Sequence, residues 1–174
     1  MGAEGVQACK VDHITRAAGV GKGTFFTHFN SKRDFVAELA GQVLSDLARR
    51  VRPMGMAPTD AESLISGVSS VHLRYFQLRP QAASLLTEAC ALGSDAVAGH
   101  LKEYVEMVAG MVSPAGVKLG WPAERARELA LMLLATACGF FWFGGPLELG
   151  ADAPADLLDR LGRALARGLT AETH

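Results

Sequence analysis

The sequence VDHITRAAGVGKGTFFTHFNSKRDF, residues 11–35, decides how the rest of the chain is interpreted. Its pattern predicts a short amphipathic helix, a tight turn at residues 18–20, a second short helix from Lys22 to Phe29, and the start of a third helix. Gly19 suits the turn because glycine adopts positive φ without steric strain. Two short helices joined by such a turn, with polar residues beside aromatic ones on the second, are typical of a helix-turn-helix that reads the DNA major groove.

The two short helices have predicted inner and outer faces. We expect Ile14 and Ala18 to face inward, Val20 to fill the corner, and Phe25 and Phe29, four residues apart, to point into the core. The remaining faces of the second helix carry side chains suited to phosphates and base edges. These are Lys22, Thr24, Thr27 and His28.

The spacing A-G-V-x-K-G-T-F-F-x-H-F-x-S-K, residues 18–32, resembles the DNA-binding head of the TetR (tetracycline-repressor-like) family of bacterial transcriptional regulators. Phe26 stands where that family usually has tyrosine, so a hydroxyl donor to phosphate is absent here. Lys32 falls in the first turn of the third helix, where its charge opposes the helix dipole unless a phosphate neutralises it. The resemblance implies that the DNA contacts come from Lys22, Gly23, Thr24, Phe26, Thr27, His28 and Lys32.

The resemblance also predicts a missing segment at the start of the head. A helix-turn-helix of this kind is a three-helix unit, and Met1 aligns with the last large apolar residue of the first helix. We therefore expect most of that helix to be absent from this chain, with weaker DNA binding as the result. The apolar side chains left without that wall would be Ile14, Phe25 and Phe29.

Charge is distributed unevenly along the 174 residues. Residues 1–52 hold eight Lys and Arg against five acids, whereas residues 53–174 hold nine against thirteen. A basic head on an acidic body suits a protein that presents one end to phosphate. With 49% hydrophobic and 20% charged residues, the composition is that of a globular protein.

The rest of the chain is predicted to be helical throughout, because no alternating β-branched run is present. Ser31 should cap a helix that reaches about Arg52, with one apolar stripe formed by Phe35, Leu39, Val43 and Leu47. Later helices are expected from Thr59 to Pro80, from Pro80 to Leu92, from Ser94 to near Pro114, from Trp121-Pro122 onward, and from Pro154 to Leu169. The prediction is an all-α fold, with a DNA-binding head over residues 1–52 and a ligand-binding and dimerisation body over residues 53–174.

Residues 129–147 contain no charge, but glycine and proline interrupt them toward one end. A buried core helix is therefore favoured over a membrane span. The three cysteines lie far apart, and no metal-ligand spacing is present. With no signal-peptide pattern, this predicts a cytoplasmic protein. No catalytic motif is recognisable, so neither enzyme activity nor a cofactor is expected.

The resemblance further implies a small effector and a second copy of the chain. An apolar effector is expected, because few charges fall on inward helix faces, although an ordinary core role is favoured for each lining residue taken individually. The expected lining is Phe76, Tyr104, Met107, Met111, Phe140, Phe141 and Trp142, with His72 and Glu88 as polar contacts.

The helix expected at about residues 123–143 is apolar on more than one face, and the last helix carries a leucine stripe. Pairing both with their copies would give a four-helix interface about a two-fold axis. The expected interface residues are Phe140, Leu158, Leu161 and Leu165.

The sequence thus predicts a homodimeric regulator, more often a repressor than an activator, that an effector releases from a palindromic DNA operator. The alternative is a helical small-molecule-binding module that has lost DNA binding through the missing first helix. A small helical enzyme has no positive support.

Overall fold

The computed structural model describes residues 9–56, 60–118 and 120–144, together with residues 160, 163–164 and 167. Its described elements are all helices, which confirms the predicted all-α fold. They are α1 (Val11–Ala17), α2 (Lys22–His28), α3 (Lys32–Val51), the 3-10 helix η1 (Arg52–Met56), α4 (Ala61–Leu78), α5 (Pro80–Ala91), α6 (Asp95–Lys118) and α7 (Ala123–Gly144).

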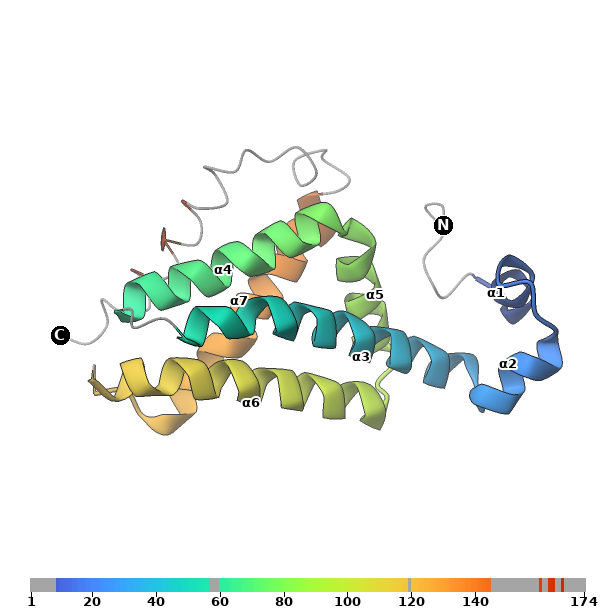
Figure 1. The fold of residues 1–174 in the computed structure, drawn as a ribbon, viewed down its shortest axis with the longest axis horizontal. Coiled ribbons are helices and arrows are strands. Elements are labelled where there is room, and N and C mark those ends of the chain that lie inside the picture. Colours follow the sequence, from blue (N-terminus) through green and yellow to red (C-terminus); the bar gives the residue numbers. More distant parts are fainter. Residues whose placement is uncertain are drawn as a thin grey trace.

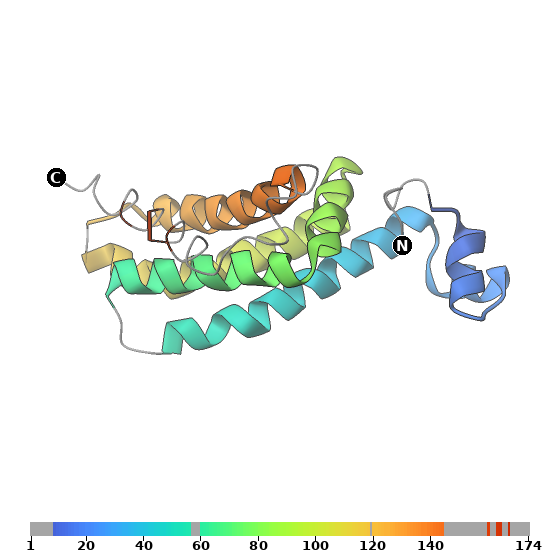
Figure 2. The ribbon, with the colours of Figure 1, turned by 90° about the horizontal axis from the view of Figure 1, so that it is seen from above.

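The helices form a small head and a larger body (Figure 1). Helices α1 and α2 make up the head, and α3 extends from the head along the whole body. In the body, α3 packs against α4, α5 and α6, while α7 packs against α4, α5 and α6. The view from above shows the head projecting from one end of this bundle (Figure 2). Only α3 spans both parts of the described chain.

Ser31 starts α3 as predicted, since its side chain accepts a hydrogen bond from the Asp34 backbone amide at 3.1 Å. The predicted apolar stripe was partly right: Leu47 is fully buried, but the buried face of α3 is wider than one stripe because several helices cover it. Phe35, Leu39 and Val43 lie half-buried at its edge. The buried residues are Val36, Ala37, Ala40, Leu44, Leu47 and Val51.

Two predicted helix boundaries were wrong. Helix α4 begins at Ala61 rather than near Thr59, because Asp60 caps it and accepts from the Ser63 amide at 2.9 Å. Helix α6 continues through Pro114 to Lys118. A proline inside a helix removes a backbone hydrogen bond, but tertiary packing maintains this one.

That packing involves Gly116 and Trp121. Gly116 is buried, and a Cβ there would lie 2.7 Å from Cε3 of Trp121. The Trp121 amide donates to the Gly116 carbonyl at 3.0 Å. The indole therefore closes the turn between α6 and α7 against the end of α6 and holds the residues beyond Pro114 in the helix.

The core of the body is apolar, and its largest fully buried side chains include Phe76, Ile65 and Val68 from α4 with Leu129 from α7. Helix α7 is a core helix as predicted, with Leu129, Leu133, Leu134, Ala137 and Phe141 buried. No helix in the described part of the chain combines the length and apolar character needed to cross a bilayer.

We expect Phe76→Ala to lower the free energy of unfolding by about 3–5 kcal/mol, because it removes a fully buried ring and leaves a cavity. Urea unfolding followed by circular dichroism measures this. Leu78→Ala is the matched control on the same helix, since Leu78 is 76% exposed and its change should stay within about 0.5 kcal/mol. Equal losses in the two variants would contradict the packing described.

Candidate nucleic-acid interface

Three phenylalanines fix the position of α2. The ring centroids of Phe25 and Phe29 are 5.3 Å apart, those of Phe25 and Phe35 are 5.4 Å apart, and those of Phe29 and Phe35 are 5.1 Å apart. Phe25 is 5% exposed. We call Phe25, Phe29 and Phe35 the aromatic triad. Because Phe35 belongs to the first turn of α3, the triad holds α2 against the start of the helix that reaches into the body.

The turn between α1 and α2 depends on Gly19, which has φ +67° as predicted. A Cβ there would meet no atom within 4 Å, so glycine is required for its backbone angle rather than for space. The turn is closed by two backbone hydrogen bonds, from Gly19 to the Arg16 carbonyl and from Val20 to the Thr15 carbonyl.

The predicted inner face of the head was partly wrong. Val20 is 43% exposed and does not fill the corner, Ala18 is also exposed, and Ile14 is half-buried. Thr15 is the buried residue of α1, and its hydroxyl donates to the Asp12 carbonyl at 3.3 Å. That hydrogen bond within the helix satisfies the hydroxyl donor of the buried Thr15 side chain. The hydrophobic pattern of the sequence therefore did not predict the burial of Thr15.

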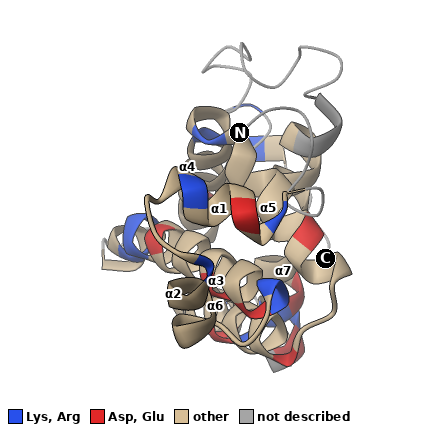
Figure 3. Ribbon diagram, turned by 90° about the vertical axis from the view of Figure 1, so that its right-hand side faces the viewer, with Lys and Arg blue, Asp and Glu red and all other residues tan. Residues whose placement is uncertain are grey.

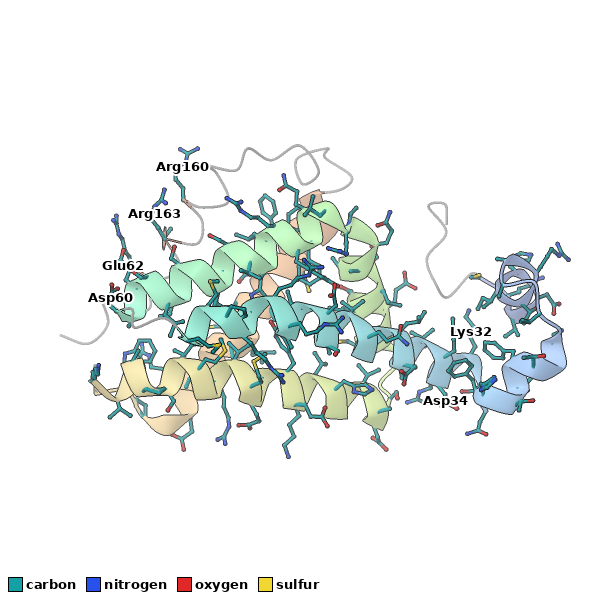
Figure 4. The ribbon with its side chains drawn as sticks, viewed as in Figure 1. Lys32, Asp34, Asp60, Glu62, Arg160 and Arg163 are labelled. Atoms are coloured by element: carbon teal, nitrogen blue, oxygen red, sulfur yellow. The ribbon has the colours of Figure 1, made fainter. Side chains whose placement is uncertain are left out.

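Six of the seven residues predicted to contact DNA are exposed. Lys22, Gly23, Thr24, Phe26, Thr27 and His28 are all exposed on α2. Phe26 is 51% exposed although it is aromatic, and a Cβ at Gly23 would meet no atom within 4 Å. Lys32 is half-buried in the first turn of α3, near Asp34 (Figure 4).

Lys22 and Thr27 are already oriented by hydrogen bonds. Lys22 Nζ lies 2.6 Å from Asp12 Oδ1, which joins α2 to α1 and lowers the pKa of the Asp12 carboxyl. Both side chains are more than half exposed, so this pair contributes little to stability and can exchange for a phosphate. The Thr27 hydroxyl donates to the Gly23 carbonyl at 3.0 Å. Its oxygen can still accept a hydrogen bond, and its methyl group can contact an apolar surface.

The charge of the head favours an anionic partner. Residues 9–35 hold five Lys and Arg but two Asp and no Glu, whereas the whole chain has a net charge of −1. Figure 3 looks onto the end of the molecule that carries α1 and α2, and in this view basic and acidic positions are interspersed along the ribbon. The excess of base is modest, so specific contacts must supply much of any binding.

The expected effector residues occupy different surroundings. Phe76 and Phe141 are buried in the core, Glu88 and Met111 are half-buried, and Phe140 lies half-buried with its ring centroid 5.0 Å from that of Phe141. The Trp142 side chain and the predicted interface residues Leu158, Leu161 and Leu165 lie outside the described residues. The apolar effector therefore stays a prediction.

His72 and Tyr104 form a buried polar pair between α4 and α6. The ring nitrogens of His72 lie 2.7 Å from the Val68 carbonyl (Nδ1) and 2.6 Å from the Tyr104 hydroxyl (Nε2). Burial lowers the pKa of His72 to about 4, so the ring is neutral, donates from Nδ1 and accepts at Nε2. Both nitrogens are thus used within the core, and an effector would have to displace one of these partners to bind His72.

A cavity of about 390 Å³ lies between α3 and α6. Of the predicted effector residues, Tyr104 and Met107 line it. Its remaining lining comes mostly from α3, including the polar residues Gln42 and Ser45, and Arg52 of η1 adds a charge. Sequence reasoning missed this cavity, because polar residues on an amphipathic helix resemble an ordinary solvated face. Among the described residues, no cluster of three or more His, Cys, Asp or Glu could hold a metal ion.

A compact helix-turn-helix held on a long helix, with a separate helical body, defines the class of helix-turn-helix regulators. Comparison with protein families agrees, since residues 1–39 match the model for bacterial regulatory proteins of the tetR family. The chain therefore carries the DNA-binding head of the TetR family, and the resemblance predicted from residues 18–32 is confirmed.

Solved structures share the fold. The transcriptional regulator FadR from Bacillus subtilis, solved with stearoyl-CoA, has a TM-score of 0.76 at 17% identity and covers 98% of this chain and 91% of its own. The fatty acid degradation regulator FadR from Bacillus halodurans has a TM-score of 0.71 at 19% identity, covering 97% and 87%. The TetR-family regulator PfmR from Thermus thermophilus has a TM-score of 0.64 at 19% identity, covering 95% and 90%.

No curated protein matches the chain. The family and these neighbours are transcriptional regulators rather than enzymes, which confirms that part of the prediction.

The buried imidazole of His72 generates a pH dependence of stability. Its folded pKa of about 4 lies below the ordinary value of 6.5, so the unfolded chain binds the proton more readily. Stability from this group is full above pH 6.5 and falls by up to about 1.4 kcal/mol per pH unit as the pH drops toward 4. Urea unfolding at several pH values should show this slope.

Replacing the imidazole should remove that slope. The His72→Gln variant is expected to lose this pH dependence. The Tyr104→Phe variant keeps the buried His72 imidazole and is expected to retain it. The assignment to His72 fails if the Gln variant shows the same pH dependence as the wild type.

Proposed function

We propose that this chain is a DNA-binding transcriptional repressor whose α2 enters the major groove. The observation that carries this proposal is the exposed surface of α2, which presents Lys22, Thr24, Thr27 and His28 from a helix fixed by the aromatic triad. The match of residues 1–39 to the tetR family supports it. Residues 1–52 would read DNA, and residues 53–174 would bind the effector and form the dimer.

The exposed residues divide into two roles. Lys22 and Lys32, at the first positions of α2 and α3, suit phosphates, and such contacts position the protein without reading sequence. Thr24, Thr27 and His28 can reach base edges, where a threonine methyl can also contact a thymine methyl. Gly23 allows close approach of the backbone, and Phe26 can pack against sugar or thymine.

A homodimer would pair two such heads on a palindromic operator. Leu131 and Met132 of α7 are 54% and 47% exposed, and Ala135, in the next turn, is also exposed. Exposed apolar residues on a helix whose opposite face is buried suit contact with a second copy, and α7 also carries the predicted interface residue Phe140. Two-fold symmetry would place the two α2 helices about 34–36 Å apart, one turn of DNA.

An effector bound in the body would release DNA through α3. This helix packs against α5 and α6 and carries Phe35 of the aromatic triad in its first turn, so a shift of α3 would move α2. Bacillus subtilis FadR was solved with stearoyl-CoA, which supports a ligand site in a body of this fold. The cavity between α3 and α6 also fits the alternative, a binding module without DNA recognition.

Selection from a pool of random DNA duplexes distinguishes the two functions. The repressor should enrich a palindrome whose half-sites are one helical turn apart, and its affinity should fall steeply with added salt. If repeated rounds recover no common sequence while the protein still binds a ligand, the chain is a binding module and not a repressor.

On the selected operator, Lys32→Ala should weaken binding to all sequences alike and reduce the salt slope by about 1, because it removes a phosphate contact. Thr27→Ala should instead alter the preference at one base pair of each half-site. Fluorescence anisotropy on the operator and its single-base variants measures both effects. Lys118→Ala, at the far end of α6, is the matched control and should leave binding unchanged. An unaltered base preference in Thr27→Ala would contradict the assigned role.

The dimer has its own test. We expect Leu131→Glu to convert the dimer into a monomer in sedimentation, because the change places a charge on the exposed apolar face of α7. Leu78→Glu is the control, at an exposed apolar residue on α4. A wild-type monomer at micromolar concentration, or a Leu131→Glu dimer, would show that α7 is not the interface.

A further inference from the structure

The cavity between α3 and α6 is a groove between two helices that run in the same direction (Figure 1). Gly41 of α3 faces His100 of α6, since a Cβ at Gly41 would lie 2.7 Å from the His100 Nε2. Farther along, Gly55 faces Met111, with its Cβ 3.0 Å from the Met111 Cγ. Increasing residue numbers therefore correspond on the two walls of the groove.

The charges along this groove are separated by sign. Glu38 and Glu103 lie in the half nearer the head, and Arg49 and Arg52 lie at the far end. Because His100 stands opposite Gly41, Glu103 stands opposite about position 44 of α3. Arg49 and Arg52 are then about 8 and 12 Å farther along the axis, at 1.5 Å per residue.

Between the two charged ends, the groove is lined by weakly polar and apolar side chains. Leu44 and Ala48 of α3 face Tyr104 and Met107 of α6. Tyr104 is buried, and its hydroxyl is used by His72, so its ring is the part available to a ligand. This stretch suits a short chain of methylene groups.

The charged ends retain the capacity to bind. Among the described residues, Arg52 and Glu103 have no ion-pair partner. Arg49 pairs with Asp46 at 3.2 Å, but its side chain is 71% exposed. Glu38 accepts only a long hydrogen bond from Gln42, at 3.4 Å.

We propose that this groove binds a zwitterionic small molecule whose cationic and anionic groups are about 10 Å apart. The ammonium group lies toward Glu103, the carboxylate lies toward Arg49 and Arg52, and the methylene chain covers Leu44, Ala48 and Met107. A fatty acid anion neutralises the arginines at one end and leaves the Glu103 carboxylate at the other end without a partner. An amine satisfies only the opposite end.

We assign the groove as the effector site of the proposed repressor. The release of DNA on ligand binding rests on that proposed function. Helix α3 forms one wall of the groove and carries the aromatic triad at its start. A ligand that separates α3 from α6 therefore moves α2.

Calorimetry with three probes of equal chain length tests the binding step without DNA. The probes are ω-aminooctanoate, octanoate and octylamine. We expect ω-aminooctanoate to bind at least tenfold more tightly than either singly charged probe. Arg52→Gln should weaken ω-aminooctanoate about tenfold, the loss of one charged contact, and leave octylamine unchanged. Glu103→Gln should weaken ω-aminooctanoate similarly and leave octanoate unchanged. Lys102→Gln, an exposed change beside Glu103, is the matched control.

The inference is overturned if octanoate binds as tightly as ω-aminooctanoate, if both groove variants bind like the wild type, or if none of the probes binds at millimolar concentration. Operator binding is measured separately in the absence of any probe. Loss of operator binding alone therefore contradicts the proposed function, whereas failure of the calorimetry alone contradicts the groove site.

Discussion

The contact among Phe25, Phe29 and Phe35 is the constraint on which the head depends. Helices α1 and α2 have seven residues each, too few to be stable alone. The triad packs α2 onto a 20-residue helix that is stabilised by the core of the body. With Phe25 buried in this way, α2 leaves Phe26 and its polar residues exposed.

Helix α3 connects the head to the body, so a movement of α3 in the body also moves the head. Its first turn carries Phe35, and Arg33 in the same turn donates to the carbonyl of Gly93, between α5 and α6. Farther along, α3 forms one wall of the charged groove. A ligand at the groove and DNA at α2 would therefore act on the same helix, which gives the proposed regulation a physical route.

The sequence predicted the parts of this structure that depend on local chemistry. The positive φ of Gly19, the Ser31 cap and the exposure of Lys22, Thr24, Thr27 and His28 follow from residue type and helical spacing. What depends on tertiary packing was missed: α6 continues past Pro114 because Trp121 packs on Gly116. The groove was missed for the same reason, since its charges become a site only when α3 and α6 lie together.

The central claim, that α2 reads DNA, is tested most directly by photocrosslinking. A benzophenone side chain at position 27, on the exposed face of α2, is compared with one at position 78, on the exposed end of α4. Both proteins are irradiated with the duplex recovered by selection. We expect a crosslink from position 27 to bases of each half-site and none from position 78. Crosslinks of equal yield from the two positions, or none from position 27, would show that α2 does not read DNA.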